Sequence, residues 1–167
     1  MTIPAPDATG FDAFAQAFRR HAAGVAVITA LDPSGRPVGF TATSLASLAA
    51  DPPLATFNMA RTASTWPAIE QTDYVAIHML GQEDYETAKI LAGPNAHRFD
   101  GDHWEPGAHG LPILRDVTAW MVGRIVARTH VANNAMIAVQ IEEGALGEPD
   151  EHLLYHERSY RALGAEL

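Results

Sequence analysis

The sequence predicts a mainly β protein, a small antiparallel β-barrel with a few short helices. Short runs of alternating or continuous apolar residues recur along the chain, separated by tight turns rich in Gly, Pro and Asp. Stretches with helical spacing are few and short, which argues against a parallel sheet whose strands alternate with helices. A length of 167 residues, 47% of them hydrophobic, suits one domain with its own core. We therefore expect a single barrel domain over residues 11–167, preceded by a loose segment at 1–10.

Composition and charge exclude several classes of protein. The chain has no cysteine, which rules out disulfides, thiolate catalysis and metal sites built on cysteine. Its net charge of −9 repels phosphate backbones and argues against general nucleic-acid binding. The longest nearly apolar run, 22–31, is far shorter than the roughly 20 residues of a membrane-spanning helix. No secretory signal is visible at 1–10, so we expect a cytoplasmic protein without membrane contact.

The first part of the chain predicts one helix and a β-hairpin. Residues 11–21 carry three phenylalanines at helical spacing, and a glycine follows shortly after as a break. Two strands, 25–31 and 37–43, flank the turn residues Asp32-Pro33-Ser34-Gly35 and should pair as a hairpin. The residues that follow, 44–50, are small and rich in hydroxyl groups.

The rest of the chain predicts short strands interrupted by two helices. Residues 64–71 are expected to form a short helix, because Ser64 or Thr65 can cap it and Pro67 suits its first turn. Apolar residues alternate along 74–80, which is typical of a strand with two different faces. The remaining elements expected are a helix at 83–91, an irregular segment at 93–114, and strands at 54–59, 118–128, 135–142 and 152–156.

The segment 40–47 is the first candidate for a binding site. Its small side chains would let a flat ligand approach the backbone, and its hydroxyls and amides offer hydrogen-bond donors. A flavin ring needs such an edge, because several of its ring atoms accept hydrogen bonds and its faces need apolar cover. The same composition is also typical of a loop whose hydroxyls bond to its own backbone. The residues concerned are Thr41, Ala42, Thr43, Ser44 and Ser47.

A second candidate lies at 58–66, where a strand ends and a short helix begins. Asn58 marks the end of the strand, and Arg61 with the hydroxyls of Ser64 and Thr65 would form a phosphate cradle at the helix N-terminus. The alternative is a capped helix beside an exposed arginine, with no ligand at all.

Three histidines, His97, His103 and His109, recur every six residues in the irregular segment, beside Asp100 and Asp102. Mixed histidine and carboxylate ligands are typical of zinc or iron sites, but this spacing in a Gly- and Pro-rich segment aligns nothing by itself. We therefore expect a solvated or cofactor-covering loop and no metal site. The chain also has no Gly-x-Ser-x-Gly and no Gly-x-Gly-x-x-Gly motif, which argues against a serine hydrolase and a Rossmann dinucleotide site.

Taken in order, these segments resemble the flavin reductase-like family of FMN-binding split barrels over about residues 18–163. The family includes the reductase components of two-component flavin monooxygenases. No single motif is specific, but the order and spacing of the motifs together are. They read FRRHAAGVAVIT at 18–29, GFTATSLASL at 39–48, DPPL at 51–54, Asn58 with Arg61, Ser64 and Thr65, YVAIHML at 74–80 with Gln82, Arg98-Phe99, and LLYH at 153–156 with Tyr160.

The resemblance implies a split antiparallel β-barrel of Greek-key type over residues 11–167. It implies that Thr41–Ser44 line the isoalloxazine edge with Ser47 nearby, and that Arg61, Ser64 and Thr65 hold the phosphate. The implied activity is hydride transfer from NADH or NADPH to FMN or FAD, with the reduced flavin supplied to an oxygenase partner. The family also implies a homodimer whose flavin lies near the subunit interface.

One departure from the family pattern concerns the nicotinamide. Family reductases commonly carry Gly-Asp-His between the last two long strands, whereas the matching residues here are Ala132-Asn133-Asn134. An amide at 134 donates and accepts hydrogen bonds but does not titrate. His130 is close in sequence but out of register, and His78 stands where Asn is usual. Two alternatives therefore stay open: a non-catalytic flavin carrier, and a flavin-dependent oxidoreductase acting on an organic substrate with the histidine-rich loop as a lid.

Overall fold

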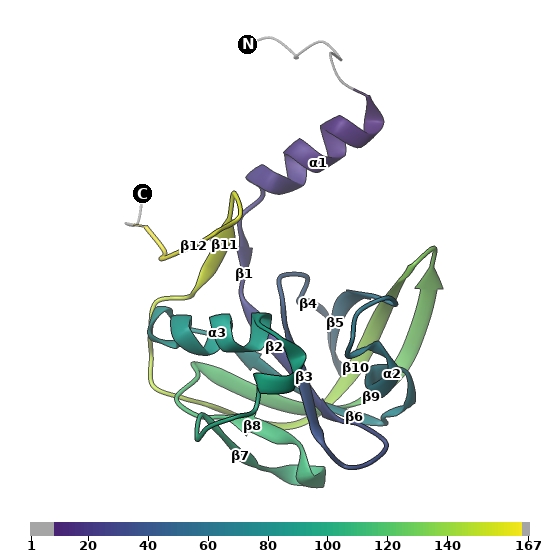
Figure 1. Ribbon diagram of the computed structural model, residues 1–167, viewed down its shortest axis with the longest axis vertical. Coiled ribbons are helices and arrows are strands. Elements are labelled where there is room, and N and C mark those ends of the chain that lie inside the picture. Colours follow the sequence, from purple (N-terminus) through teal and green to yellow (C-terminus); the bar gives the residue numbers. More distant parts are fainter. Residues whose placement is uncertain (1–8, 165–167) are drawn as a thin grey trace.

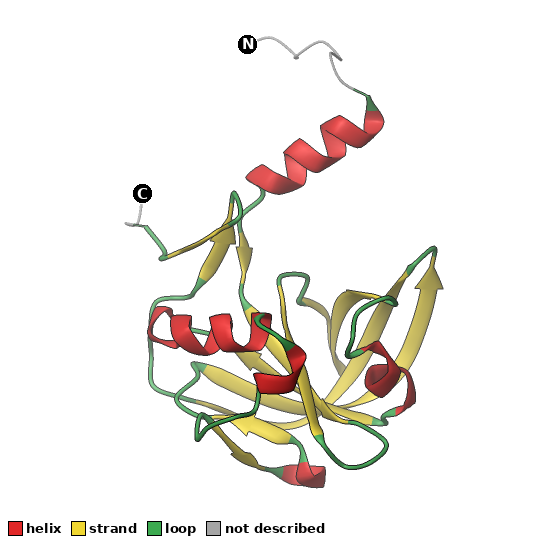
Figure 2. Cartoon of the chain, in the orientation of Figure 1, coloured by secondary structure: helices red, strands yellow, loops and turns green. Residues whose placement is uncertain are grey.

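The computed structural model describes residues 9–164, and its main feature is one large antiparallel sheet that rolls up on itself (Figures 1 and 2). The sheet has seven strands in the order β3-β2-β6-β9-β10-β5-β4, each antiparallel to its neighbours. The strands are β2 (Ala26–Leu31), β3 (Pro37–Ala42), β4 (Ala46–Ala50), β5 (Pro53–Ala60), β6 (Tyr74–Met79), β9 (Ala119–Val131) and β10 (Asn134–Leu146).

The roll of this sheet brings strands from opposite ends of the strand order into contact. The ring of Phe40 on β3 meets the ring of Phe57 on β5 edge to face, with 6.0 Å between centroids. Within residues 9–164 no ladder of backbone hydrogen bonds joins β3 to β4 or β5, so the barrel stays split along this line. The predicted mainly β, split antiparallel barrel is confirmed.

Two smaller sheets and three helices complete the described chain. They are the sheet β1 (Ala23–Gly24), β11 (Leu154–His156) and β12 (Ser159–Arg161), the hairpin β7 (Trp104–Pro106) and β8 (Pro112–Leu114), the helices α1 (Gly10–Arg20), α2 (Trp66–Gln71) and α3 (Tyr85–Ala92), and 3-10 turns at Gln82–Asp84, Asn95–His97 and Ala108–Gly110. Figure 1 shows α1 projecting away from the barrel, and none of its residues is buried. No helix in the described part of the chain is long and apolar enough to cross a membrane.

The strand β6 shows why the barrel needs a second layer. Four of its successive residues, Val75 to His78, are buried, although simple alternation predicts one buried face. Val75 and Ile77 pack into the barrel core, whereas Ala76 faces a second cluster that includes Leu111 and Ile113. The segment expected to be irregular at 93–114 therefore supplies β7, β8 and an outer cover for the sheet.

The other differences from the sequence prediction are shifted element ends and short strands that the sequence did not predict. The hairpin β9–β10 runs to Val131 and Asn134, beyond the predicted 118–128 and 135–142, because backbone pairing continues after the buried residues stop. The hydroxyl-rich residues after β3 give the edge strand β4. Of the segment expected to be loose, residues 1–8 lie outside the described residues, and Thr9 accepts a hydrogen bond from the Asp12 amide at the start of α1.

His78 fastens the outer layer to the barrel. Its ring is fully buried, with Nδ1 3.1 Å from the carbonyl oxygen of Val27 and Nε2 3.1 Å from the amide nitrogen of Leu114. A carbonyl only accepts and an amide N–H only donates, so the ring must be neutral with its proton on Nδ1. Burial lowers the pKa of His78 to about 4, although the bond to Val27 partly counters this effect.

Acid should therefore destabilise the fold through His78. The folded-state pKa lies below the unfolded value of 6.5, so the contribution is present above pH 6.5 and is lost as the pH falls toward 4. We expect the free energy of unfolding to fall by about 2–3 kcal/mol more in the wild type than in His78→Asn between pH 7 and pH 4. Urea unfolding at several pH values measures this difference. Parallel pH dependences in the two proteins would contradict the assignment.

Candidate functional site

An open pocket of about 450 Å³ lies where the split barrel fails to close. Its walls come from the end of β3 and the loop after it, from the end of β5, and from the loop that leads into α2. Its size is in the range of sites for small molecules and cofactors. The lining residues are Phe40, Thr41, Ala42, Thr43, Ser44, Asn58, Met59, Ala60, Ala63, Ser64, Thr65, Arg98 and Asn134.

The pocket brings together most of the residues that the sequence proposed for a cofactor. Those that line it are Thr41, Ala42, Thr43, Ser44, Asn58, Ser64 and Thr65. Two others do not line it. Ser47 lies exposed on the edge strand β4, and the exposed Arg61 places its guanidinium 5.9 Å from the centroid of the Trp66 ring. The two candidate segments, 41–44 for the ring and 64–65 for the phosphate, thus line one pocket. Arg61, expected at the phosphate, does not line it.

Two of the pocket hydroxyls hold the walls in place. Thr41 donates from Oγ1 to the carbonyl oxygen of Ala88 on α3, at 3.1 Å. Ser44 donates from Oγ to the carbonyl oxygen of Asn58 at 3.1 Å and accepts from the Asn58 amide at 2.9 Å. These hydroxyls bond to backbone, as the alternative interpretation of the segment held, but across the fold and not within the loop.

The amides of the same wall remain free to meet a ligand. Across residues 9–164, the N–H groups of Thr43, Ser44 and Leu45 donate to no backbone carbonyl and to no side chain. Backbone donors of this kind suit a heterocycle whose edge accepts hydrogen bonds, and Phe40 and Met59 add apolar surface. This wall can therefore orient a planar ring through fixed backbone groups.

The opposite end of the pocket carries donors suited to an anion. Thr65 is 1% exposed, yet its hydroxyl makes no hydrogen bond with any other part of residues 9–164. In the described chain, every side-chain oxygen that is sealed from solvent has a hydrogen-bond partner. The Thr65 hydroxyl has none, so its oxygen must reach the pocket surface. The amides of Ser64 and Thr65 likewise have no backbone acceptor there. Two hydroxyls and two amides thus converge without partners of their own.

The start of α2 differs from the expected helix cap. Thr65 stands at the N-cap position but has helical dihedral angles, φ −89° and ψ −11°, and its side chain caps nothing. The helix is also only six residues long, so a large helix dipole is not available to hold an anion. The hydroxyls and amides of the loop, and not the helix end, are the groups that would bind a phosphate.

Two further residues line the pocket although the sequence did not assign them a cofactor contact. Asn134 is the first residue of β10, next to the two-residue turn Ala132-Asn133, and lies opposite Ala60 in the ladder. Arg98 reaches the pocket from the segment expected to be irregular. His130, considered as a substitute for a missing histidine, packs against Trp66 instead and does not line the pocket.

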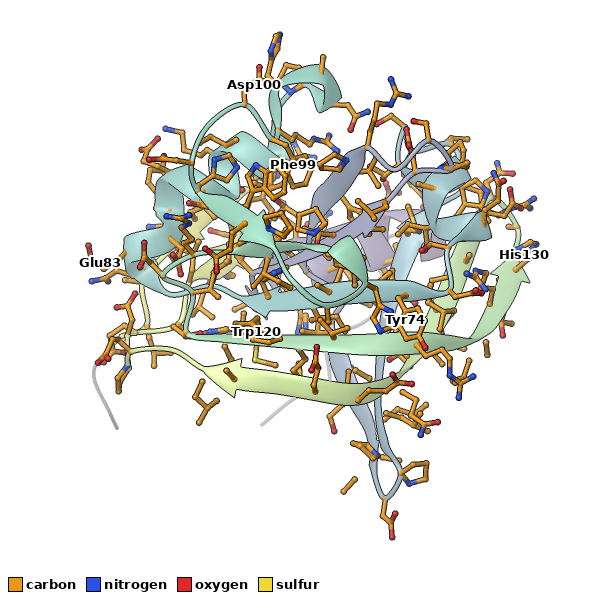
Figure 3. All side chains as sticks on the ribbon, turned by 90° about the horizontal axis from the view of Figure 1, so that it is seen from below. Tyr74, Glu83, Phe99, Asp100, Trp120 and His130 are labelled. Carbon is orange, nitrogen blue, oxygen red and sulfur yellow. The ribbon has the colours of Figure 1, made fainter. Side chains whose placement is uncertain are left out.

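The three histidines of the 93–114 segment separate in space. His97 pairs with Asp100 at 2.8 Å, and His103 donates from Nε2 to the carbonyl oxygen of Arg98 at 2.9 Å. His109 stacks on Tyr74 with 3.8 Å between ring centroids, and Figure 3 shows Tyr74 far from Asp100. Among the described residues, no three His, Asp or Glu side chains lie close enough together to hold a metal ion.

Comparison with known proteins decides the family. The model of the flavin reductase like domain matches residues 18–164, which is most of the chain. The chain belongs to the flavin reductase-like family. This agrees with the resemblance that the motifs between 18 and 163 carry.

Relatives of this flavin reductase-like chain match nearly its whole length. The NADH:FMN oxidoreductase of Rhodococcus erythropolis is 36% identical over 149 residues, covering 86% of this chain and 77% of that protein. The crystal structure of a flavin reductase domain protein from Arthrobacter sp. FB24 is 48% identical and superposes with a TM-score of 0.89, covering 93% and 97% of the two chains. Flavin reductase HpaC, solved in complex with NADP+, is 25% identical with a TM-score of 0.84, covering 92% and 97%.

Proposed function

We propose that this flavin reductase-like chain binds FMN in the pocket of the split barrel and reduces it with NADH. The observation that carries the proposal is the single slot shared by the free amides after β3 and the free hydroxyls before α2. FMN has a planar ring that accepts hydrogen bonds at one end and a phosphate at the other. FAD and NADPH remain the alternatives for the two nucleotides, and the names of the relatives favour FMN and NADH.

The ring end would lie against the wall formed by Thr41 to Ser44. The free amides of Thr43 and Ser44 would donate to the polar edge of the ring, while Phe40 and Met59 cover apolar surface. Bound FMN supplies the redox chemistry, accepting a hydride from C4 of the nicotinamide at N5. The protein supplies orientation and donors fixed in advance, which stabilise negative charge as the flavin is reduced.

The phosphate end would lie at Ser64 and Thr65. Hydrogen bonds to a charged phosphate oxygen are shorter and stronger than neutral ones, so two hydroxyls and two amides form a suitable site. The sequence alone supports Arg61 as a phosphate ligand. In the structure its side chain lies over Trp66, outside the pocket lining.

Asn134 is the residue at the pocket that would meet the nicotinamide. Hydride transfer needs no general acid or base, so an amide in place of the family histidine is compatible with the reaction. A non-catalytic flavin carrier is the second candidate, and the same amide favours it. None of the residues that line the pocket titrates between pH 5 and 8.

We also propose that the chain forms a homodimer and works in the cytoplasm with an oxygenase component. The projecting helix α1 exposes Phe11, Phe14 and Phe18 by 79%, 62% and 63%, and a partner subunit would cover them. Related proteins include the flavin reductase components of a tryptophan halogenase and of styrene monooxygenase, which favours delivery of reduced flavin to an oxygenase. Sedimentation of the purified chain tests the dimer.

The proposed reaction is visible in the flavin spectrum. We expect the purified chain, titrated with FMN, to bind it, and we expect NADH added without oxygen to bleach the yellow flavin absorbance, because reduction removes the oxidised ring's absorption. NADPH added in parallel measures the preference between the two nucleotides. A chain that binds FMN but is bleached by neither nucleotide would favour the carrier or an enzyme with an organic substrate.

The phosphate assignment predicts a selective loss of affinity in Thr65→Val. Removing a hydrogen bond to a charged group should raise the Kd for FMN about tenfold or more, while the Kd for riboflavin changes little because riboflavin has no phosphate. Thr62→Val is the matched control, since Thr62 lies exposed in the same loop and does not line the pocket. Fluorescence titration gives both constants, and equal losses for the two flavins would count against the site.

The amide at Asn134 predicts a reaction that does not depend on an ionisable side chain. With riboflavin as the acceptor, which avoids titration of a phosphate, we expect kcat/KM for NADH to be flat between pH 5.5 and 7.5. Asn134→His should introduce a pH dependence with a midpoint at about 6.5, the ordinary histidine pKa. Steady-state rates across this range measure it. A variant as flat as the wild type would show that residue 134 does not face the nicotinamide.

A further inference from the structure

Arg98 is the one charged residue among the described residues that line the pocket. The sequence pointed to Arg61 as the counter-charge for the cofactor, but Arg61 lies over Trp66, outside the lining. In a chain of net charge −9, a local cation favours the binding of an anionic ligand. Arg98 is therefore the lining residue whose charge could serve an anionic ligand.

The guanidinium of Arg98 is held in place without being neutralised. Nε donates to the carbonyl oxygen of Gly93 at 3.0 Å, and Nη1 donates to the carbonyl oxygen of Gly39 at 2.6 Å and to Oδ1 of Asn95 at 3.4 Å. All three acceptors are uncharged, and no carboxylate of residues 9–164 pairs with Arg98. Nη2 has no acceptor in that part of the chain, so it can still donate to a ligand.

The backbone that carries Arg98 is fixed as well. His103 donates to the Arg98 carbonyl, and the Trp104 indole donates to the Phe99 carbonyl at 3.1 Å. The Phe99 ring packs directly on β3 at Gly39, where a Cβ would lie 3.0 Å from Cζ of Phe99 and 2.9 Å from the Ile28 carbonyl oxygen. This site therefore needs no reorganisation of the arginine when a ligand arrives.

A comparison with Arg128 separates this arrangement from a purely structural clamp. Arg128 is also half-buried and donates to two backbone carbonyls, those of Ile69 and Thr72. Burial lowers the pKa of both guanidinium groups, and both stay charged at neutral pH. The charge of Arg128 is balanced by nearby Asp73 and Glu70, and it does not line the pocket. Arg98 has no such acids and faces the ligand space.

We propose that Arg98 supplies the positive charge that faces an anionic oxygen of the bound flavin. The inference rests on the proposed function and makes Arg98 a binding and positioning residue for the flavin. Two parts of the cofactor carry such an oxygen: the phosphate of FMN, and the N1–O2 edge of the ring once the flavin is reduced. Both are recognised by the same chemistry, a charge-assisted hydrogen bond from a guanidinium.

The test is a comparison of Arg98→Met with the matched control Arg128→Met. Kd values are measured for oxidised FMN and riboflavin, and the midpoint potential is measured for each bound flavin without oxygen. Relative to Arg128→Met, we expect Arg98→Met to weaken binding of the flavin form whose anionic oxygen it faces, either oxidised FMN or the reduced flavins, about tenfold or more, as for other charge-assisted bonds. A loss confined to FMN in the oxidised state assigns the phosphate, whereas a lowered midpoint potential with both flavins assigns the reduced ring.

The opposite result is equally clear. If Arg98→Met binds both flavins and holds their potentials as the wild type does, the inference is overturned. Arg98→Gln, which keeps an amide donor for the backbone carbonyls, gives the same comparison if Arg98→Met does not fold. If the wild type binds FMN but NADH does not reduce the bound flavin, the proposed function is contradicted and the inference is not. The Kd values of the variants then still decide the role of Arg98. A wild type that binds no flavin defeats both.

Discussion

The two hydrogen bonds between Ser44 and the backbone of Asn58 continue the β4–β5 pairing, whose first pair is Ala46 and Thr56, up to the end of β3. The strand β3 ends the seven-stranded sheet on one side, and β5 is next to its edge on the other, so their approach depends on side chains. Phe40 and Phe57 fill the apolar part of this seam. The pocket is the polar remainder of the same seam, and its shape follows from how the split is bridged.

Bridging the split divides the work among neighbouring polar groups. The hydroxyls of Thr41 and Ser44 donate to backbone carbonyls of α3 and β5. The backbone amides of residues 43–45 stay free to face the pocket. At the other end the hydroxyl of Thr65 is left without a partner although the residue is buried. Because that oxygen reaches the pocket surface, solvent or a ligand can satisfy it. The donor set therefore marks the place where the proposed ligand would bind.

The sequence predicted the fold and most of the pocket because both follow from local signals. Alternating apolar runs and turn residues define strands directly, and the hydroxyl-rich segments at 41–44 and 64–65 lie on the loops that line the pocket. Arg98 was missed as a site residue because its place depends on Phe99 packing against Gly39, a contact between segments sixty residues apart that no local pattern reveals. The direction of Arg61 was equally hidden, since it depends on Trp66.

The turn before β10 is built on a residue that is not glycine. Ala132 has φ +49°, in the left-handed region that favours glycine, so alanine holds a backbone conformation there to which it is less suited. The turn places residue 134 opposite the end of β5, at the pocket. The side chain presented there is an amide, which does not titrate. An amide at that point would orient a bound nicotinamide through simultaneous donation and acceptance, and alignment of the two rings is what hydride transfer needs.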